Sequence, residues 1–158
     1  MMEPSFEKLL ALLAEAAVEF IVVGGVAVSI QGYVRLTEDV DLLIEASSEN
    51  INRLLTTLAN YGEGFARELS LEDFDDEEGA IRIVETTERC QIDLFTRISG
   101  RRYSDVIADA DRFKVGRHQI AIASKKSLIG WKSASVREKD RFDADVLRRL
   151  QENPQAFH

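Results

Sequence analysis

Two aspartates, Asp39 and Asp41, flank a single valine at the end of the stretch Arg35–Asp41. Residues two apart in a β-strand project from the same face, separated by roughly 6–7 Å of rise, so both carboxylates would point the same way while Val40 enters the core. Two carboxylates held side by side repel each other, and a divalent cation removes that conflict. The pair therefore indicates either a metal site or, if it stood alone, a solvated acidic start of a strand.

A third aspartate, Asp93, interrupts the apolar segment 91–95. Aspartate is depleted in strand interiors, and its neighbours Ile92 and Leu94 would face the opposite side of the strand. Such an aspartate either faces solvent from a half-buried sheet or serves as a ligand. Taken by itself, the position favours the solvent-facing interpretation.

The apolar run 20–23 leads directly into Gly24 and Gly25, and a short apolar helix is expected to follow over 26–32. Glycine allows a tight turn and the close approach of a ligand, and the first N–H groups of the helix would point at a bound phosphate. The turn matches neither the dinucleotide-binding pattern GxGxxG nor the P-loop, which ends in GK[ST]. Without other features it would be an ordinary connection between a strand and a helix.

Basic residues gather toward the C-terminus. Lys132 lies at the end of an apolar helical segment that contains Leu128, Ile129 and Trp131. A lysine there could reach a phosphate, although lysines at such places more often extend to solvent. Residues 97–149 hold 14 basic and 7 acidic side chains, whereas the whole chain has a net charge of −8. This block is either a set of solvated helix faces or a surface for a polyanion.

Hydrophobic periodicity places these residues on predicted elements. The expected helices cover about residues 5–17, 26–32, 48–61 (capped by Ser47 or Ser48), 124–134 and 137–150, and the expected strands cover 20–23, 40–44, 81–85, 91–95, 113–115 and 119–123. Residues 63–79 show no clear period and are expected to form loop and strand edge. Because both crossovers and hairpins would connect the strands, the predicted fold is α+β, a mixed sheet flanked by helices. We expect one domain over residues 1–158, with a core over about 1–123 and a helical part over about 124–158.

Composition excludes several classes of protein. Hydrophobic residues make up 45% of the 158 residues and charged residues 30%, which is typical of a globular domain. No run of about 18 apolar residues could span a membrane. The single Cys90 excludes a disulfide framework, and with only His118 and His158 beside it a Cys/His zinc site is excluded too. Since the N-terminus has no signal-like pattern, we expect a cytoplasmic protein.

The combination of features resembles the nucleotidyltransferase superfamily related to DNA polymerase β. The signature of that superfamily is an apolar strand, Gly-Gly or Gly-Ser, about a dozen residues, Asp-apolar-Asp, and a third Asp on a later strand. This chain has Val23-Gly24-Gly25, thirteen intervening residues, Asp39-Val40-Asp41, and then Ile92-Asp93-Leu94. The resemblance covers roughly residues 18–146.

Three further patterns look like the small bacterial enzymes grouped with the AbiEii abortive-infection toxins. They are Arg35-x-Thr37-x-Asp39-x-Asp41, Leu128-Ile129-x-x-Lys132 and Lys139-Asp140-x-x-Asp143. The chain departs from the superfamily at Gly25, where a serine often contacts a phosphate, so that only backbone contact remains there. The resemblance implies a minimal nucleotidyltransferase fold with C-terminal helices and, as a further partner, a toxin–antitoxin protein.

The resemblance also implies transfer of a nucleoside monophosphate from an NTP to an acceptor hydroxyl, with release of pyrophosphate. Asp39 and Asp41 would hold one Mg²⁺ on the triphosphate, and Asp39, Asp41 and Asp93 a second, with Mn²⁺ as a substitute; paired cations of this kind stabilise the entering and leaving oxygens. The residues implied to bind the nucleotide are Gly24, Gly25, Arg35, Thr37 and Lys132. The roles of Arg137, Lys139, Asp140 and Asp143 stay open.

Other functions fit the same sequence. The fold could serve as an antitoxin or regulatory module that binds nucleotide or a protein partner without turnover, as a nucleotide sensor, or as an α+β domain without a site. For an active enzyme, the acceptor could be RNA, a protein or a small molecule. The basic block over 97–149 places RNA with a tRNA-like end slightly ahead of the others.

Overall fold

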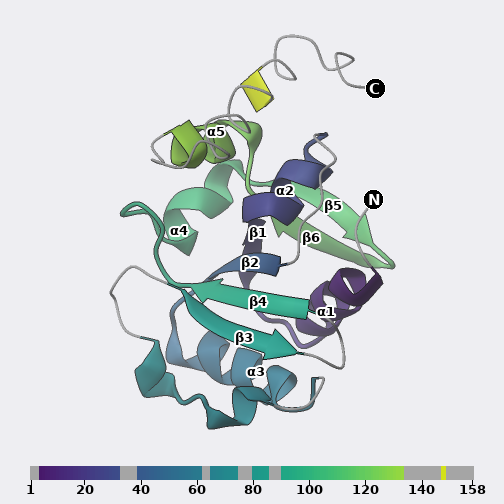
Figure 1. Ribbon diagram of the computed structural model, residues 1–158, viewed down its shortest axis with the longest axis vertical. Helices are drawn as coiled ribbons and strands as arrows, with labels where there is room; N and C mark the ends of the chain where they lie inside the picture. Colours follow the sequence, from purple (N-terminus) through teal and green to yellow (C-terminus); the bar gives the residue numbers. More distant parts are fainter. Residues whose placement is uncertain are drawn as a thin grey trace.

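The described strands form one mixed sheet, in the order β3-β4-β2-β1-β6-β5 (Figure 1). Their bounds are β1 Phe20–Val23, β2 Asp39–Ile44, β3 Ile81–Glu85, β4 Cys90–Phe95, β5 Asp111–Val115 and β6 His118–Ile122. The computed structural model describes residues 4–32, 39–61, 65–74, 80–85, 90–133 and 147–148. Every strand predicted from the sequence is present, within two residues at each end.

Strand directions follow from the connections. The pairs β1–β2, β3–β4 and β5–β6 are antiparallel, whereas β2–β4 and β1–β6 are parallel. Parallel neighbours need a crossover connection, while antiparallel neighbours can be joined by a short turn. The mixed sheet and the α+β class predicted from the sequence are therefore confirmed.

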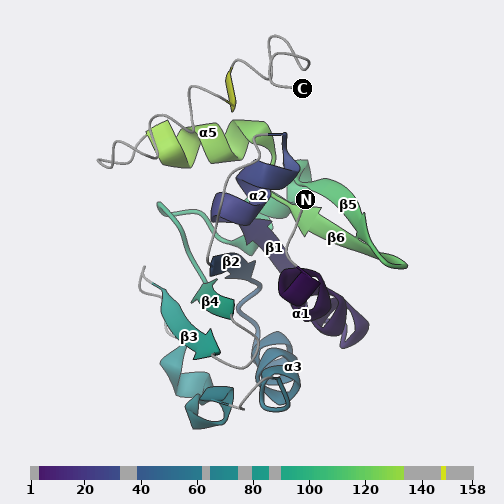
Figure 2. The same cartoon turned by 45° about the vertical axis from the view of Figure 1, so that its right-hand side comes forward.

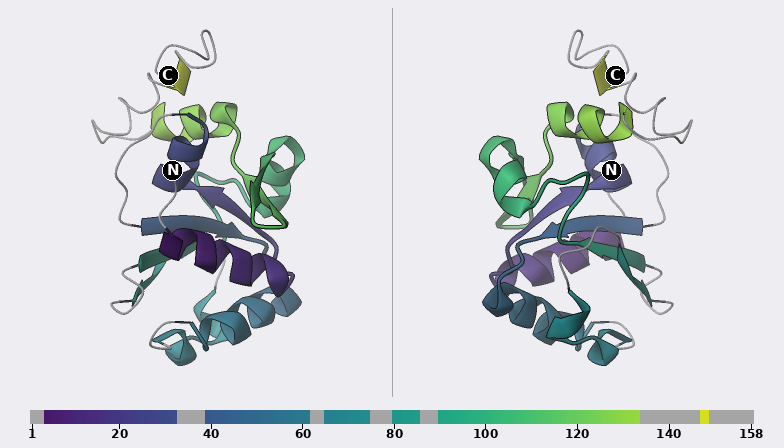
Figure 3. Two further views of the ribbon diagram at one scale, coloured as in Figure 1. Left: turned by 90° about the vertical axis from the view of Figure 1, so that its right-hand side faces the viewer. Right: turned by 90° about the vertical axis from the view of Figure 1, so that its left-hand side faces the viewer.

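Helices cover both faces of this sheet. Their bounds are α1 Pro4–Glu15, α2 Gly24–Ile30, α3 Ser48–Leu58, α4 Tyr103–Val106 and α5 Lys125–Ser133, with 3₁₀ helices at Phe65–Glu68, Leu71–Asp73 and Ile107–Asp109. Helices α1 and α3 lie on one side of the sheet, and α2, α4 and α5 lie on the other (Figures 2 and 3). The chain changes from the sheet to the layer of α2, α4 and α5 at the end of β1, because α2 begins at the next residue.

The core forms where the predicted apolar stripes meet the sheet. In α1 and α3 the buried side chains recur three and four residues apart, as the sequence predicts: Phe6, Leu9, Leu10 and Leu13, then Ile51, Leu54 and Leu58. Ser47 caps α3, because its hydroxyl accepts a hydrogen bond from the Asn50 N–H at 3.2 Å. The predicted helix over 124–134 is α5, whereas the predicted helix over 137–150 lies outside the described residues except for 147–148.

One expectation about local structure is wrong, and one short helix was missed. Residues 63–79, expected to form loop and strand edge, include two 3₁₀ helices, and α4 was not expected at all. Two of these three elements, Leu71–Asp73 and α4, begin where a backbone N–H donates to a carboxylate: Ser70 to Asp73 at 2.8 Å, and Arg102 to Asp105 at 2.9 Å. Turns of three or four residues are too short to show a hydrophobic period, so for Leu71–Asp73 and α4 the capping carboxylate was the available signal.

Asn50 joins α3 to the two central strands. Its side chain is fully buried; Oδ1 accepts from the Glu19 N–H at 2.7 Å, and Nδ2 donates to the carbonyls of Glu19 at 2.9 Å and Glu45 at 2.8 Å. Glu19 precedes β1 and Glu45 follows β2, so one amide fixes both strand ends against the helix. A buried amide with all these bonds made stabilises the fold, because any one of its partners would be left unsatisfied without it.

Asn50→Ala should therefore lower the free energy of unfolding by about 1–3 kcal/mol, the usual cost of a buried group left without its hydrogen bond. Urea denaturation followed by circular dichroism measures the change. The matched control is Asn60→Ala, because the exposed Asn60 makes one long hydrogen bond, to the Thr56 carbonyl at 3.4 Å. Its effect should stay within about 0.5 kcal/mol. Equal losses in the two variants would contradict the role assigned to Asn50.

Candidate active site

Three carboxylates from two neighbouring strands meet on one face of the sheet. Asp39 and Asp41 lie on β2, and Asp93 lies on the parallel neighbour β4, where the register pairs Asp41 with Asp93. Partners in register project from the same face, so the two side chains lie next to each other. Each of the three residues offers a carboxylate oxygen, and these oxygens all lie within 4.8 Å of one another. The arrangement concentrates negative charge at one point of the sheet.

Asp93 is the most buried member of this cluster. It is only 4% exposed, whereas Asp39 and Asp41 are half-buried. The solvent-facing interpretation, which the sequence favours for Asp93 taken by itself, is therefore wrong. It fails because the face of β4 that carries Asp93 is covered by the cluster itself and by a cation from β3. Burial of a charged carboxylate requires partners of this kind.

The cation is Arg82, on the antiparallel neighbour β3, whose register places it directly opposite Asp93. Its Nε–H donates to Asp93 Oδ1 at 3.0 Å, and its Nη2–H donates to Oδ2 at 3.4 Å. The hydrogen bond to Asp93 and the charge of that carboxylate raise the pKa of Arg82, and the charges of Asp39 and Asp41 act in the same direction. The Arg82 side chain is 60% exposed, whereas that of Asp93 is 6% exposed. The guanidinium therefore lies between the buried carboxylate and the solvent.

Gly24 brings the glycine turn against the same carboxylates. Val23, the last residue of β1, pairs with Asp41, and α2 begins at the next residue. Gly24 has φ +68°, and a Cβ at this position would lie 2.8 Å from Asp41 Cγ. Both the backbone conformation and the lack of space therefore require glycine. The helix begins two residues earlier than the predicted range of 26–32, because the glycines themselves form its first turn.

Other predicted site residues are placed only in part. Arg35 and Thr37 lie outside the described residues, as do Arg137, Lys139, Asp140 and Asp143. The backbone of Lys132 belongs to α5, which packs on α2 on the face of the sheet that carries the glycine turn. Within α5, Trp131 is half-buried under the guanidinium of Arg101, 5.6 Å from the ring centroid. The last helical turn of α5 is therefore held on the same side as the carboxylate cluster.

Sequence reasoning missed Arg82, although a signal was present. The expected strands over 81–85 and 91–95 are close enough in sequence to form a hairpin. Once Glu85 lies opposite Cys90, counting back along the hairpin places Arg82 opposite Asp93. A basic and an acidic residue at facing positions of an antiparallel pair attract each other. The pattern within either strand alone does not show this pair, because it depends on the register between the two strands.

The donor set fits a small, hard divalent cation. Carboxylate oxygens are the ligands that Mg²⁺ and Mn²⁺ prefer, and three of them within bridging distance offer more negative charge than Arg82 neutralises. Nitrogen and sulfur ligands, which zinc and copper prefer, are absent from this cluster of described residues. The chemistry that such a group supports is transfer at a phosphate, where developing negative charge must be stabilised.

Comparison with known proteins identifies the family of the chain. Residues 4–156 match the model of a family described as "Nucleotidyl transferase of unknown function (DUF2204)". The chain belongs to this family. The resemblance to the nucleotidyltransferase superfamily is therefore confirmed, and this nucleotidyltransferase is an enzyme by its family. A search of curated proteins finds no match to the chain.

Solved structures of similar fold support the architecture of this nucleotidyltransferase. One is the lincosamide antibiotic adenylyltransferase LnuA, bound to lincomycin, with TM-score 0.66, 15% identity, and coverage of 95% of this chain and 98% of that one. Another is an antigenic nucleotidyltransferase-like protein from Paracoccidioides brasiliensis, with TM-score 0.55, 17% identity, and coverage of 91% and 73%. At these identities the likeness concerns the fold. Among the described residues, no helix is both long and apolar enough to cross a membrane.

Gly24→Ala should lower the free energy of unfolding by at least about 1–2 kcal/mol, the cost of a left-handed conformation for an L-residue, before the clash with Asp41 is counted. The control is Gly130→Ala in α5, because a Cβ there meets nothing within 4 Å. That change should raise the free energy of unfolding by about 0.4–1 kcal/mol. Thermal unfolding of both variants is the measurement, and a stable Gly24→Ala protein would contradict the close approach.

Proposed function

We propose that this protein transfers a nucleoside monophosphate from an NTP to an acceptor hydroxyl and releases pyrophosphate, with Mg²⁺ or Mn²⁺ held by Asp39, Asp41 and Asp93. The observation that carries the proposal is the convergence of three carboxylate oxygens within 4.8 Å, directly beside the glycine turn. Divalent cations at such a site neutralise charge on the triphosphate and activate the attacking hydroxyl. The family of the chain supports the same chemistry.

The position of each residue in the site suggests which substrate it would contact. Asp41 lies against the glycine turn, and Asp39 and Asp41, both half-buried on β2, would bind on the side of the triphosphate. The first N–H groups of α2 have no partner within the helix, and at Gly24 and Gly25 a phosphate oxygen could approach them closely. Asp93, on the far side of Asp41, would act on the side of the acceptor hydroxyl. Arg35, Thr37 and Lys132 stay predicted ligands of the triphosphate.

Arg82 is proposed as the positioning residue for Asp93. Its two hydrogen bonds fix both carboxylate oxygens of Asp93, so the orientation of this carboxylate toward Asp41 does not depend on a bound cation. Carboxylates that hold metals are commonly oriented by such second partners, whose loss typically costs 10–100-fold in affinity or activity. Arg82 thus acts through Asp93 and would not touch the reacting atoms.

The acceptor is not identified by the site. Exposed basic residues Arg112, Lys114 and Arg117 lie on β5 and its turn, at the opposite edge of the sheet from β3 and β4. An RNA strand that contacts them would have to cross the sheet to reach Asp93. RNA remains the acceptor predicted from the charge of residues 97–149, and membership of the AbiEii-like group and a toxin–antitoxin partner remain predictions from the motifs.

Asp41→Asn should abolish transfer and leave the fold intact. The protein is incubated with Mg²⁺, cell extract and each of the four α-labelled NTPs, and the labelled RNA, protein and small-molecule fractions are counted. Labelling should fall at least about a hundredfold, because even partners of metal ligands are worth up to that much. The unfolding midpoint should stay or rise, because one of three repelling charges is removed.

The control for this experiment is Glu49→Gln, an equal loss of charge at the exposed start of α3 on the other side of the sheet, which should label like the wild type. Severe destabilisation by Asp41→Asn would identify a structural aspartate. Absence of labelled product with every NTP would favour the binding-module alternative. Label in protein alone would overturn the prediction of an RNA acceptor and leave nucleotidyl transfer standing.

Arg82→Gln should lower kcat about tenfold or more and leave the KM for NTP within about twofold, since Asp93 is assigned to the acceptor side. Arg82→Lys should recover part of kcat, because an ammonium keeps the charge but cannot form the two parallel hydrogen bonds of a guanidinium. Steady-state kinetics, with the acceptor that the labelling experiment identifies, is the measurement. The control is Lys8→Gln, an equal loss of positive charge at an exposed position of α1 on the other side of the sheet, which should leave kcat unchanged. Equal kcat for Arg82→Gln and the wild type would contradict the positioning role.

A further inference from the structure

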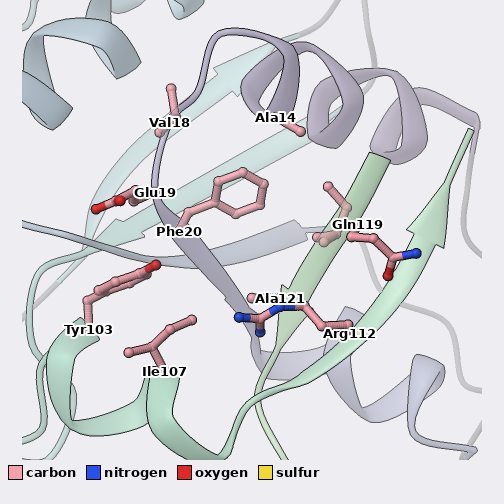
Figure 4. A pocket seen from close by; sticks show the side chains of 10 residues that line it. Ala14, Val18, Glu19, Phe20, Tyr103, Ile107, Arg112, Gln119 and Ala121 are labelled. Atoms are coloured by element: carbon pink, nitrogen blue, oxygen red, sulfur yellow. The ribbon is translucent and has the colours of Figure 1, made fainter. Parts of the chain in front are cut away.

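A pocket of about 200 Å³ lies beside the N-terminal end of β1, where the end of α1, the start of β6 and α4 come together (Figure 4). Side chains of two kinds line it. Phe20 and Ile107 supply apolar surface, while Glu19, Tyr103, Arg112 and Gln119 supply polar groups. No role in nucleotidyl transfer accounts for this set of residues.

This pocket is separate from the carboxylate cluster. Phe20 pairs with Ile44 on β2, whereas Val23, three residues later, pairs with Asp41. Three residues of strand span about 10 Å. An acceptor hydroxyl must come within contact distance of the reacting phosphate, so a small molecule held wholly within this pocket cannot be the acceptor. The pocket therefore calls for a ligand of its own.

Two opposite charges in the pocket have no ion-pair partner among the described residues. Glu19 and Arg112 are both exposed, and they form no salt bridge with each other; the Arg112 guanidinium makes one long hydrogen bond, to the Asp111 carbonyl at 3.4 Å. Figure 4 shows Tyr103 on the side of the pocket that carries Glu19, with its phenol oxygen directed into the pocket. An anion and a cation on either side of an apolar floor present complementary partners to a molecule that carries both charges.

The backbone that carries two of these polar side chains is held in place. The backbone N–H and carbonyl of Glu19 are both bonded to the buried Asn50, and α4, which carries Tyr103, is capped by Asp105. Burial, followed by the charge of Glu19, raises the pKa of Tyr103. The phenol therefore stays protonated at neutral pH and can donate a hydrogen bond to a carboxylate. Groups arranged before a ligand arrives lose less conformational freedom when it binds.

The size of the pocket limits the ligand. Pockets for drug-sized molecules usually measure about 300–1,000 Å³, so a pocket of about 200 Å³ is too small for a nucleoside triphosphate. We propose that it binds a free α-amino acid with an apolar side chain: Arg112 would hold the carboxylate, Glu19 the ammonium group, and Phe20 and Ile107 the side chain. A guanidinium matches a carboxylate with two parallel hydrogen bonds. The proposal does not rest on the nucleotidyl transfer.

Titration of ¹⁵N-labelled protein with L-phenylalanine tests the proposal. Amide shifts should move at Tyr103, Gln119 and Ala121 and stay still at Asp39 and Asp41. Two analogues separate the charges: phenethylamine lacks the carboxylate, and 3-phenylpropanoate lacks the ammonium group. Each should bind at least about tenfold more weakly than phenylalanine, because each loses one charge-assisted interaction. Absence of shifts at millimolar phenylalanine, or shifts centred on the carboxylate cluster, would overturn the proposal.

Two pairs of variants assign the charges. Arg112→Gln should weaken phenylalanine about tenfold or more and leave phenethylamine unchanged, whereas Glu19→Gln should weaken phenylalanine and leave 3-phenylpropanoate unchanged. The matched controls are Lys114→Gln on the same strand and Glu15→Gln at the end of α1, because neither residue lines the pocket. Equal affinity of each variant and its control would show that the charges do not hold the ligand and would overturn the assignment.

Discussion

Repulsion among three carboxylates is the constraint around which this end of the sheet is organised. Parallel pairing of β2 with β4 places Asp41 directly beside Asp93, which no local sequence rule would do. Left alone, such a group would favour uptake of protons or separation of the strands. Arg82 offsets part of the charge from one side, and the glycine turn leaves space for the Asp41 carboxylate on the other. The site is therefore assembled from four strands and one helix start, each of which supplies one requirement.

The elements of this fold could be predicted wherever side-chain burial repeats with a period. The stripes of α1 and α3 and the fully buried β1 were identified because their apolar residues recur at the spacing of a helix or run without interruption. The short helix α4 and the 3₁₀ helix Leu71–Asp73 were missed, because each is too short for a hydrophobic period and begins at one backbone N–H that donates to Asp105 or Asp73. Such hydrogen bonds depend on the geometry of single residues, which the average properties of a sequence segment do not show.

In the candidate site, too, features that depend on local spacing were predicted, and features that depend on distant residues were not. The spacing of Asp39 and Asp41 predicted that both lie on one face of a strand. Asp93 was predicted only from the resemblance to nucleotidyltransferases, because the pattern of its own strand favoured a solvent-facing position. The requirement for glycine at position 24 depends on the distance to Asp41, a residue far along the chain, and could not be computed from the turn itself. Arg82 belongs to a register between two strands, so reading either strand alone could not find it.

The position of Arg82 has one more consequence. Among the described strands, β3 is an edge strand, paired only with β4, and the neighbouring Val84 is 51% exposed. Strand ends at an edge open locally at lower free energy than strands paired on both sides. When β3 opens, Asp93 loses its counter-ion while its partners on β2 stay in place. The rate at which β3 amides exchange with deuterium therefore depends on the strength of the ion pair between Arg82 and Asp93. Hydrogen exchange at this edge strand measures how strongly the carboxylate cluster attracts Arg82.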